Sequence, residues 1–168
     1  MNKMDTNDNF ADRFFRAKTV FRIITGTMTT WILMIAFQAD QSTPVEIVLD
    51  LAVFAALLLI SYVFASILGE EIVAQRQTNL RRVFEMVVDV SPVLLATVPP
   101  FLIFTIASFG IISVKTGLLL SDLSHLAILF GVGFVAGKSI GAVRRGLLDG
   151  TLAAGIGLGL VVLRAIVV

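Results

Sequence analysis

Residues 51–69, LAVFAALLLISYVFASILG, carry no charge and run directly into residues 70–82, EEIVAQRQTNLRR, which hold five charged side chains. A helix needs about 20 mostly apolar residues to cross the hydrocarbon core of a membrane, and the first stretch meets that length. The second stretch is too charged to lie in the core. After Gly69 no proline or glycine interrupts the charged stretch, so we expect the helix to cross the membrane and project beyond it.

The composition of the whole chain also indicates a membrane protein. It is 57% hydrophobic and 15% charged, with a mean hydropathy of +0.96, and a soluble domain of 168 residues does not carry such values. We therefore expect an all-α integral membrane protein in which residues 20–168 form one domain of five transmembrane helices. The predicted spans are residues 20–38, 46–69, 91–113, 122–141 and 147–167.

The basic residues predict the orientation of these spans. All lysines and arginines except Lys115 and Arg164 lie in or beside the N-terminal arm, residues 1–19, the segment between the second and third spans, or the turn between the fourth and fifth. By the positive-inside rule the N-terminus is cytoplasmic and the C-terminus lies outside. The arm is not followed by a small-residue cleavage site, so we do not expect it to be a signal peptide. The expected location is the plasma membrane of a bacterium, and nucleic acid is not an expected partner because the basic residues are scattered.

Residues 70–88 are expected to form an amphipathic helix at the cytoplasmic face. Their apolar positions Val73, Leu80, Phe84 and Val87 recur at helical spacing. The second transmembrane helix would then extend into the cytoplasm through this segment.

Small residues recur in the last two spans. Gly133, Gly137 and Gly141 fall four residues apart in the fourth span, and Gly146, Gly150 and Ala154 repeat the spacing in the fifth. Such faces let helix backbones approach closely, so we expect the two spans to pack against each other or against a second subunit. A permeation path lined by glycine is the alternative.

Two prolines and several polar residues interrupt the apolar spans. Pro99 and Pro100 predict a kink in the third span. Thr25 and Thr29 lie one turn apart on the first span, where they serve helix packing or line a pore. Asp50 would collect cations at the outer mouth, or be an interfacial carboxylate wetted by headgroup water.

Asp149 and His125 are ionisable residues of the last two spans. Asp149 follows Arg145 by four residues, which favours a local ion pair at the inner interface. His125 is placed near the outer end of the fourth span, where a histidine is usually solvated.

Carboxylates gather where the second span ends. Glu70 and Glu71 lie at this exit and Glu85 follows about four turns later. Divalent cations, including Fe²⁺ and Mn²⁺, accept oxygen ligands, so these acids could receive a metal that leaves a pore. A solvated helix face is the alternative reading.

The layout resembles the vacuolar iron transporter family. SILGEEIVAQRQ, residues 66–77, is similar to the small-residue run of that family followed by glycine, glutamate and, seven residues after the glutamate, glutamine: here Gly69, Glu70 and Gln77. RRGLLDGTLAAGIGLGL, residues 144–160, is similar to its basic, glycine-rich last helix. The resemblance implies five spans, a cytoplasmic N-terminus, a second helix that continues into the cytoplasm, and a homodimer whose pore lies between the first helices.

The chain departs from this family at two places. Thr25 stands where the family has a pore aspartate, and the cytoplasmic metal-binding domain is cut to about 19 residues that retain Glu85 and Met86. Met28, one turn along from Thr25, could offer a sulfur ligand to Fe²⁺.

The sequence therefore predicts export of Fe²⁺ or Mn²⁺ from the cytoplasm, with exchange against protons as one form of the mechanism. Thr25 and Thr29 would line the pore, and the metal would contact Met28 and the carboxylates Glu70, Glu71, Glu85 and Asp50. The alternative is a non-transporting subunit that assembles with other membrane subunits. An enzyme is not expected, because the chain has one histidine, no cysteine and no catalytic motif, and no cofactor is expected.

Overall fold

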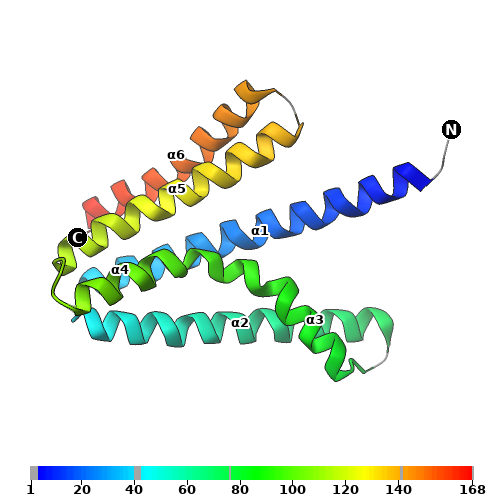
Figure 1. Ribbon diagram of the computed structural model, residues 1–168, viewed down its shortest axis with the longest axis horizontal. Coiled ribbons are helices and arrows are strands. Elements are labelled where there is room, and N and C mark those ends of the chain that lie inside the picture. Colours follow the sequence, from blue (N-terminus) through cyan, green and yellow to red (C-terminus); the bar gives the residue numbers. More distant parts are fainter. Residues whose placement is uncertain (1–3, 40–42, 76, 141, 168) are drawn as a thin grey trace.

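A computed structural model describes residues 4–39, 43–75, 77–140 and 142–167, and these residues form helices joined by short connections. The helices are α1 (Met4–Ala39), α2 (Pro44–Ala74), α3 (Leu80–Val90), the 3-10 helix η1 (Ser91–Ala96), α4 (Val98–Ser108), α5 (Val114–Ile140) and α6 (Val143–Val167). The prediction of an all-helical protein is confirmed for the described residues. Figure 1 shows α5 and α6 as a hairpin, with α4 running along α2.

Long apolar helices agree with a multi-pass membrane protein. Within the described residues, Ala17–Ala36, Pro44–Ala74 and Val114–Ser139 are long and apolar enough to cross a membrane. Leu80–Ala96 and Val98–Ser108, bent by 56° at their junction, would together give a fourth span. The predicted fifth span, which corresponds to α6, is not among these segments, so five spans and their orientation stay predictions.

Two predicted helix boundaries differ from the structure. α1 is already helical at Met4, so most of the predicted N-terminal arm continues the first helix. α5 starts at Val114 rather than at residue 122, because Ser113 caps it: the Ser113 hydroxyl accepts a hydrogen bond from the Thr116 backbone N–H at 3.1 Å. Residues 40–42, in the first outward connection, and Gly141, in the predicted packing motif, lie outside the described residues.

The kink expected in the third span is present. η1 ends at Ala96, and α4 begins at Val98 with Pro99 and Pro100 in its first turn. Proline is tolerated there because the first N–H groups of a helix have no intrahelical partner. The two prolines therefore start a new helix after the bend and do not interrupt one.

The junction after α2 differs from the continuous helix predicted over residues 70–88. α2 does continue past Gly69, as expected, but only to Ala74, where Gln75 adopts a left-handed conformation with φ of 50°. α3 then starts after Asn79, whose side chain accepts a hydrogen bond from the Arg82 backbone N–H at 2.9 Å. Asparagine is a strong N-cap, so it favours a second helix start within the charged stretch.

The predicted packing of the two glycine-rich helices is confirmed. A Cβ atom on Gly133 would come within 2.6 Å of the Asp149 carbonyl oxygen, and one on Gly146 within 2.8 Å of the Phe134 carbonyl oxygen. Larger side chains would therefore separate α5 from α6. The predicted local pair between Arg145 and Asp149 is also present, at 3.9 Å.

A second contact region joins α1 to the rest of the protein. Met34 packs with Ile47 and Leu51 of α2 and with Phe104 and Ala107 of α4 in one buried cluster. This cluster holds the ends of α1 and α4 against the start of α2, as the left side of Figure 1 shows.

Candidate functional site

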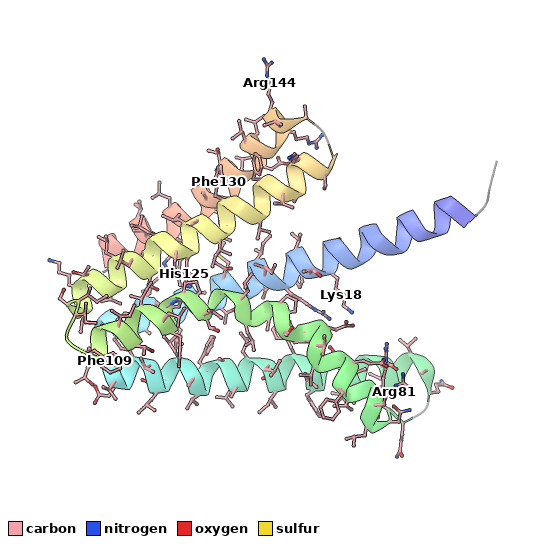
Figure 2. The ribbon with its side chains drawn as sticks, viewed as in Figure 1. Lys18, Arg81, Phe109, His125, Phe130 and Arg144 are labelled. Atoms are coloured by element: carbon pink, nitrogen blue, oxygen red, sulfur yellow. The ribbon has the colours of Figure 1, made fainter. Side chains whose placement is uncertain are left out.

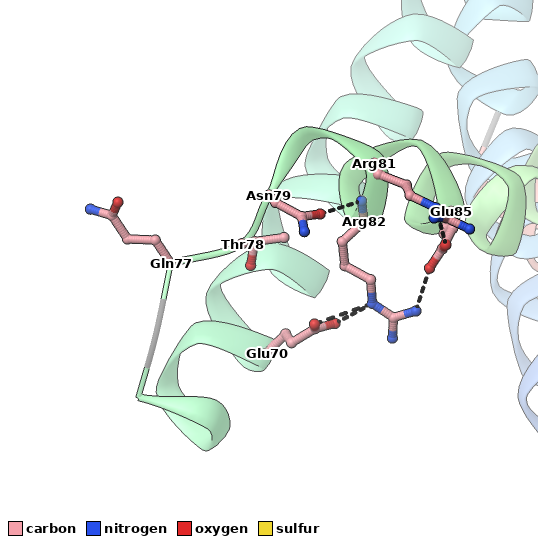
Figure 3. A pocket seen from close by; sticks show the side chains of 7 residues that line it. All are labelled: Glu70, Gln77, Thr78, Asn79, Arg81, Arg82 and Glu85. Atoms are coloured by element: carbon pink, nitrogen blue, oxygen red, sulfur yellow. Dashed lines mark hydrogen bonds and ion pairs between the residues drawn. The ribbon is translucent and has the colours of Figure 1, made fainter.

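Glu70 and Glu85, two of the carboxylates predicted to bind metal near the end of α2, are held by an arginine. Arg82 Nε lies 3.1 and 2.9 Å from the two oxygens of Glu70, and Arg82 Nη1 lies 2.8 Å from Glu85 Oε2. Glu71 accepts a hydrogen bond from the Thr78 backbone N–H at 3.0 Å. These contacts, drawn in part in Figure 3, fasten α3 to the end of α2.

The same residues line an open hollow of about 410 Å³. Its lining residues are Glu70, Gln77, Thr78, Asn79, Arg81, Arg82 and Glu85. Among the described residues no three acidic or histidine side chains are grouped closely enough to hold a metal ion. The Arg82 guanidinium already lies between Glu70 and Glu85, so a cation could bind both carboxylates only after displacing it.

The other predicted metal and pore residues do not form one site with this junction. Asp50 lies 20 residues before Glu70 on α2, which is about 30 Å along a helix. Thr25 and Thr29 donate hydrogen bonds to the carbonyl oxygens four residues earlier, at 2.9 and 2.7 Å. Met28 lies between these two threonines and is partly buried. The hydroxyl groups of both threonines are thus satisfied within α1, as expected for helix packing.

A polar cluster that was not predicted lies between α1 and α5. The indole Nε1–H of Trp31 donates a hydrogen bond to Asp122 Oδ1 at 2.8 Å. The Trp31 ring stacks on the imidazole of His125, with centroids 5.5 Å apart and planes 17° apart. Trp31 and His125 are both 0% exposed. Figure 2 places His125 within the helix assembly.

The hydrogen bonding of His125 leaves one ring nitrogen without a partner. Nδ1 lies 2.7 Å from the Ser121 carbonyl oxygen. A carbonyl can only accept, so Nδ1 carries the hydrogen and the neutral ring has a free lone pair on Nε2. Nε2 is buried and has no hydrogen-bond partner among the described residues, and the same holds for the hydroxyl groups of Thr30 and Ser121. A buried polar group without a partner costs about 1–3 kcal/mol, so three such groups together need an explanation.

Helix periodicity brings these groups together. Thr27, Thr30, Trp31 and Met34 form the buried face of α1, and Gly117, Ser121, His125 and Leu129 form that of α5. The two helices are in contact. Trp31 is the residue through which this face of α1 contacts Asp122 and His125 of α5.

The predicted position of His125 near a solvated helix end is wrong. His125 lies 11 residues after the start of α5, about 16 Å along the helix. The error came from placing the start of the fourth span at residue 122, whereas α5 starts at Val114. The spacing of Ser121, Asp122 and His125, which places all three on one side of a helix, was the available signal.

α6 completes the surroundings of the cluster. A Cβ atom on Gly157 would lie 2.5 Å from Cζ3 of Trp31 and 2.9 Å from Cδ1 of Leu129. The Trp31 ring therefore touches α6 at Gly157, stacks on His125 of α5 and belongs to α1. One side chain thus connects three helices.

Comparisons with protein-family models, with curated proteins and with solved structures gave no match. The resemblance to the vacuolar iron transporter family therefore stays a prediction.

Proposed function

We propose that this protein is a multi-pass membrane transporter that moves cations, with binding of a proton at His125 as part of its cycle. The observation that carries the proposal is the buried imidazole whose Nε2 has no partner among the described residues, in a helix long enough to span a membrane. Ionisable side chains, histidine included, are rare within transmembrane segments and usually mark functional sites there. Asp122, three residues before His125, supplies a carboxylate in the same cluster.

Within this proposal, the transported ion is a divalent cation such as Fe²⁺ or Mn²⁺, and the protein works as a homodimer with a cytoplasmic N-terminus. Glu70 and Glu85 would contact the ion at the cytoplasmic end of α2. Because Arg82 pairs with both carboxylates, the ion would have to compete with this guanidinium. The ion would therefore bind only transiently at the end of α2, because tight binding would need carboxylates that no arginine occupies.

Transport by purified protein in liposomes tests the proposal. Mn²⁺ uptake and internal pH would be followed together, for the parent protein, for His125→Gln and for Lys115→Gln. Lys115 is an exposed charge at the start of the same helix and is the matched control. We expect Mn²⁺ movement coupled to protons in the parent and in Lys115→Gln, and loss of most of it in His125→Gln. Absence of flux in the parent, or full flux in His125→Gln, would contradict the proposal.

A second candidate is a non-transporting subunit of a larger membrane complex. Gly155 and Gly159 on α6 are exposed, and a Cβ atom on either would meet nothing within 4 Å among the described residues. Such small residues let another helix approach closely. Purification in a mild detergent should then recover foreign subunits in stoichiometric amounts, and a homodimer alone would count against this function.

A further inference from the structure

We infer that His125 and Trp31 form a proton-responsive pair, in which Nε2 of His125 reversibly binds a proton and the face of Trp31 and the carboxylate of Asp122 hold the charged ring. The inference rests on the proposed function only in giving this proton a role in transport. The pair itself follows from the contacts between α1 and α5.

The proton balance of this step is simple. The neutral ring keeps one proton on Nδ1, where it is donated to the Ser121 carbonyl oxygen. A hydronium ion that reaches the cluster transfers its proton to the Nε2 lone pair and leaves as water. The ring then carries one positive charge, and the Nδ1 hydrogen bond is unchanged. Protonated Nε2 becomes a donor, and the Ser121 hydroxyl, one turn earlier on the same helix, is a buried group without a partner among the described residues.

Two neighbours of the ring, Trp31 and Asp122, would attract its charged form. A cation within about 6 Å of the centroid of a tryptophan ring is attracted to its face, and the His125 and Trp31 centroids are 5.5 Å apart. The Asp122 carboxylate, three residues before His125 on α5, accepts the Trp31 N–H. A carboxylate close to a protonated imidazole would offset its charge, which lowers the cost of keeping that charge in the membrane.

The other helices packed nearby bring no second charged group to the ring within the described side chains. α4, which packs on α5, has no titratable residue. On α1, Arg22 lies nine residues before Trp31, and its guanidinium donates to the Asp89 carbonyl oxygen. On α6, Asp149 lies beside Gly133 and Gly137 of α5, two or three turns beyond His125. The response to pH is therefore assigned to His125 with Asp122.

The chain provides its own probes for this inference. Trp31 is its only tryptophan and His125 its only histidine. An imidazolium ring quenches the fluorescence of a stacked indole more strongly than a neutral imidazole does. Protonation of His125 should therefore lower the emission of Trp31, and the signal comes from this one pair.

The experiment is a pH titration of Trp31 fluorescence in lipid nanodiscs, between about pH 8 and about pH 5, where a histidine can change its charge. The parent protein should lose emission in a single-proton transition that reverses on return to the higher pH. His125→Gln should show no such transition, and Lys115→Gln should behave as the parent. Nitrogen-15 NMR of labelled histidine in the parent gives a second readout that needs no variant: the Nε2 resonance should move to the position of a protonated nitrogen over the same range.

The outcomes separate this inference from the proposed transport. Emission and Nε2 resonances that do not change with pH would overturn the inference, and so would an equal emission change in His125→Gln. A normal titration in a protein that moves no cation would support the proton-responsive pair and remove the transporter. Cation flux in a protein whose histidine does not titrate would support the transporter and overturn the proton-responsive pair.

Discussion

Replacement of Gly157 by alanine tests whether Trp31 connects α1, α5 and α6. The new methyl group would lie 2.5 and 2.9 Å from two carbons of the Trp31 ring and 2.9 Å from Cδ1 of Leu129. The ring cannot easily move away, because its N–H is bonded to Asp122 and its face is stacked on His125. Overpacking of this kind costs about 1–3 kcal/mol, and rupture of the bond to Asp122 would add about 0.5–1.5 kcal/mol.

Gly155→Ala is the matched control on the same helix. A Cβ atom at Gly155 meets nothing within 4 Å among the described residues, so this variant reports only the gain in helix propensity, up to about 1 kcal/mol. The same gain applies to Gly157→Ala and cancels in the comparison. From overpacking alone we therefore expect Gly157→Ala to be less stable than Gly155→Ala by about 1–3 kcal/mol.

The assay is reversible unfolding in mixed micelles with increasing SDS, followed by circular dichroism, with Trp31 emission as a local readout. The Gly157→Ala variant should unfold at lower SDS and should show altered Trp31 emission while still folded. Equal free energies of unfolding for the two variants, with unchanged emission, would refute the placement of Trp31 against α6.

Two further changes test the remaining contacts. Gly133→Ala places a methyl group against the backbone of α6 and should destabilise the protein by about 1–3 kcal/mol relative to the control Gly131→Ala. A Cβ atom at Gly131 meets no neighbouring atom among the described residues. Equal unfolding transitions of the two variants would argue against the close α5–α6 contact. Arg82→Ala removes two half-exposed ion pairs and should cost no more than about 1 kcal/mol. It should also strengthen Mn²⁺ binding measured by calorimetry, because Glu70 and Glu85 lose their partner; unchanged binding would exclude these two carboxylates as metal ligands.

Much of the fold could be predicted because its signals are local. The apolar stretch from residue 51 to residue 69 lies within one helix, and the bend falls next to Pro99, as the loss of a backbone donor requires. The glycines of α5 and α6 predicted the packing of these helices because a missing Cβ is the condition for close approach.

The junction after α2 was harder to predict because two local preferences compete there. The charged stretch has helical periodicity throughout, yet Asn79 can start a new helix. The new helix is stabilised further because Arg82 pairs with Glu70 of the preceding helix. Helical periodicity alone does not predict the pair between Arg82 and Glu70, because it forms only when α3 folds back beside the end of α2. Glu70 and Glu85, which were expected to receive a metal, therefore pair with Arg82.

The sequence by itself determined that the chain is helical and suited to a membrane, since hydropathy and helix period need no tertiary contact to be read. Only the tertiary structure decided where His125 lies and what it contacts. Its neighbour Trp31 lies 94 positions earlier in the chain, and no local pattern reports a contact across that separation. The start of α5 at Val114 moved His125 from a helix end into the helix assembly, and packing against α1 left its Nε2 buried without a partner among the described residues. That environment makes a single histidine the residue to test first.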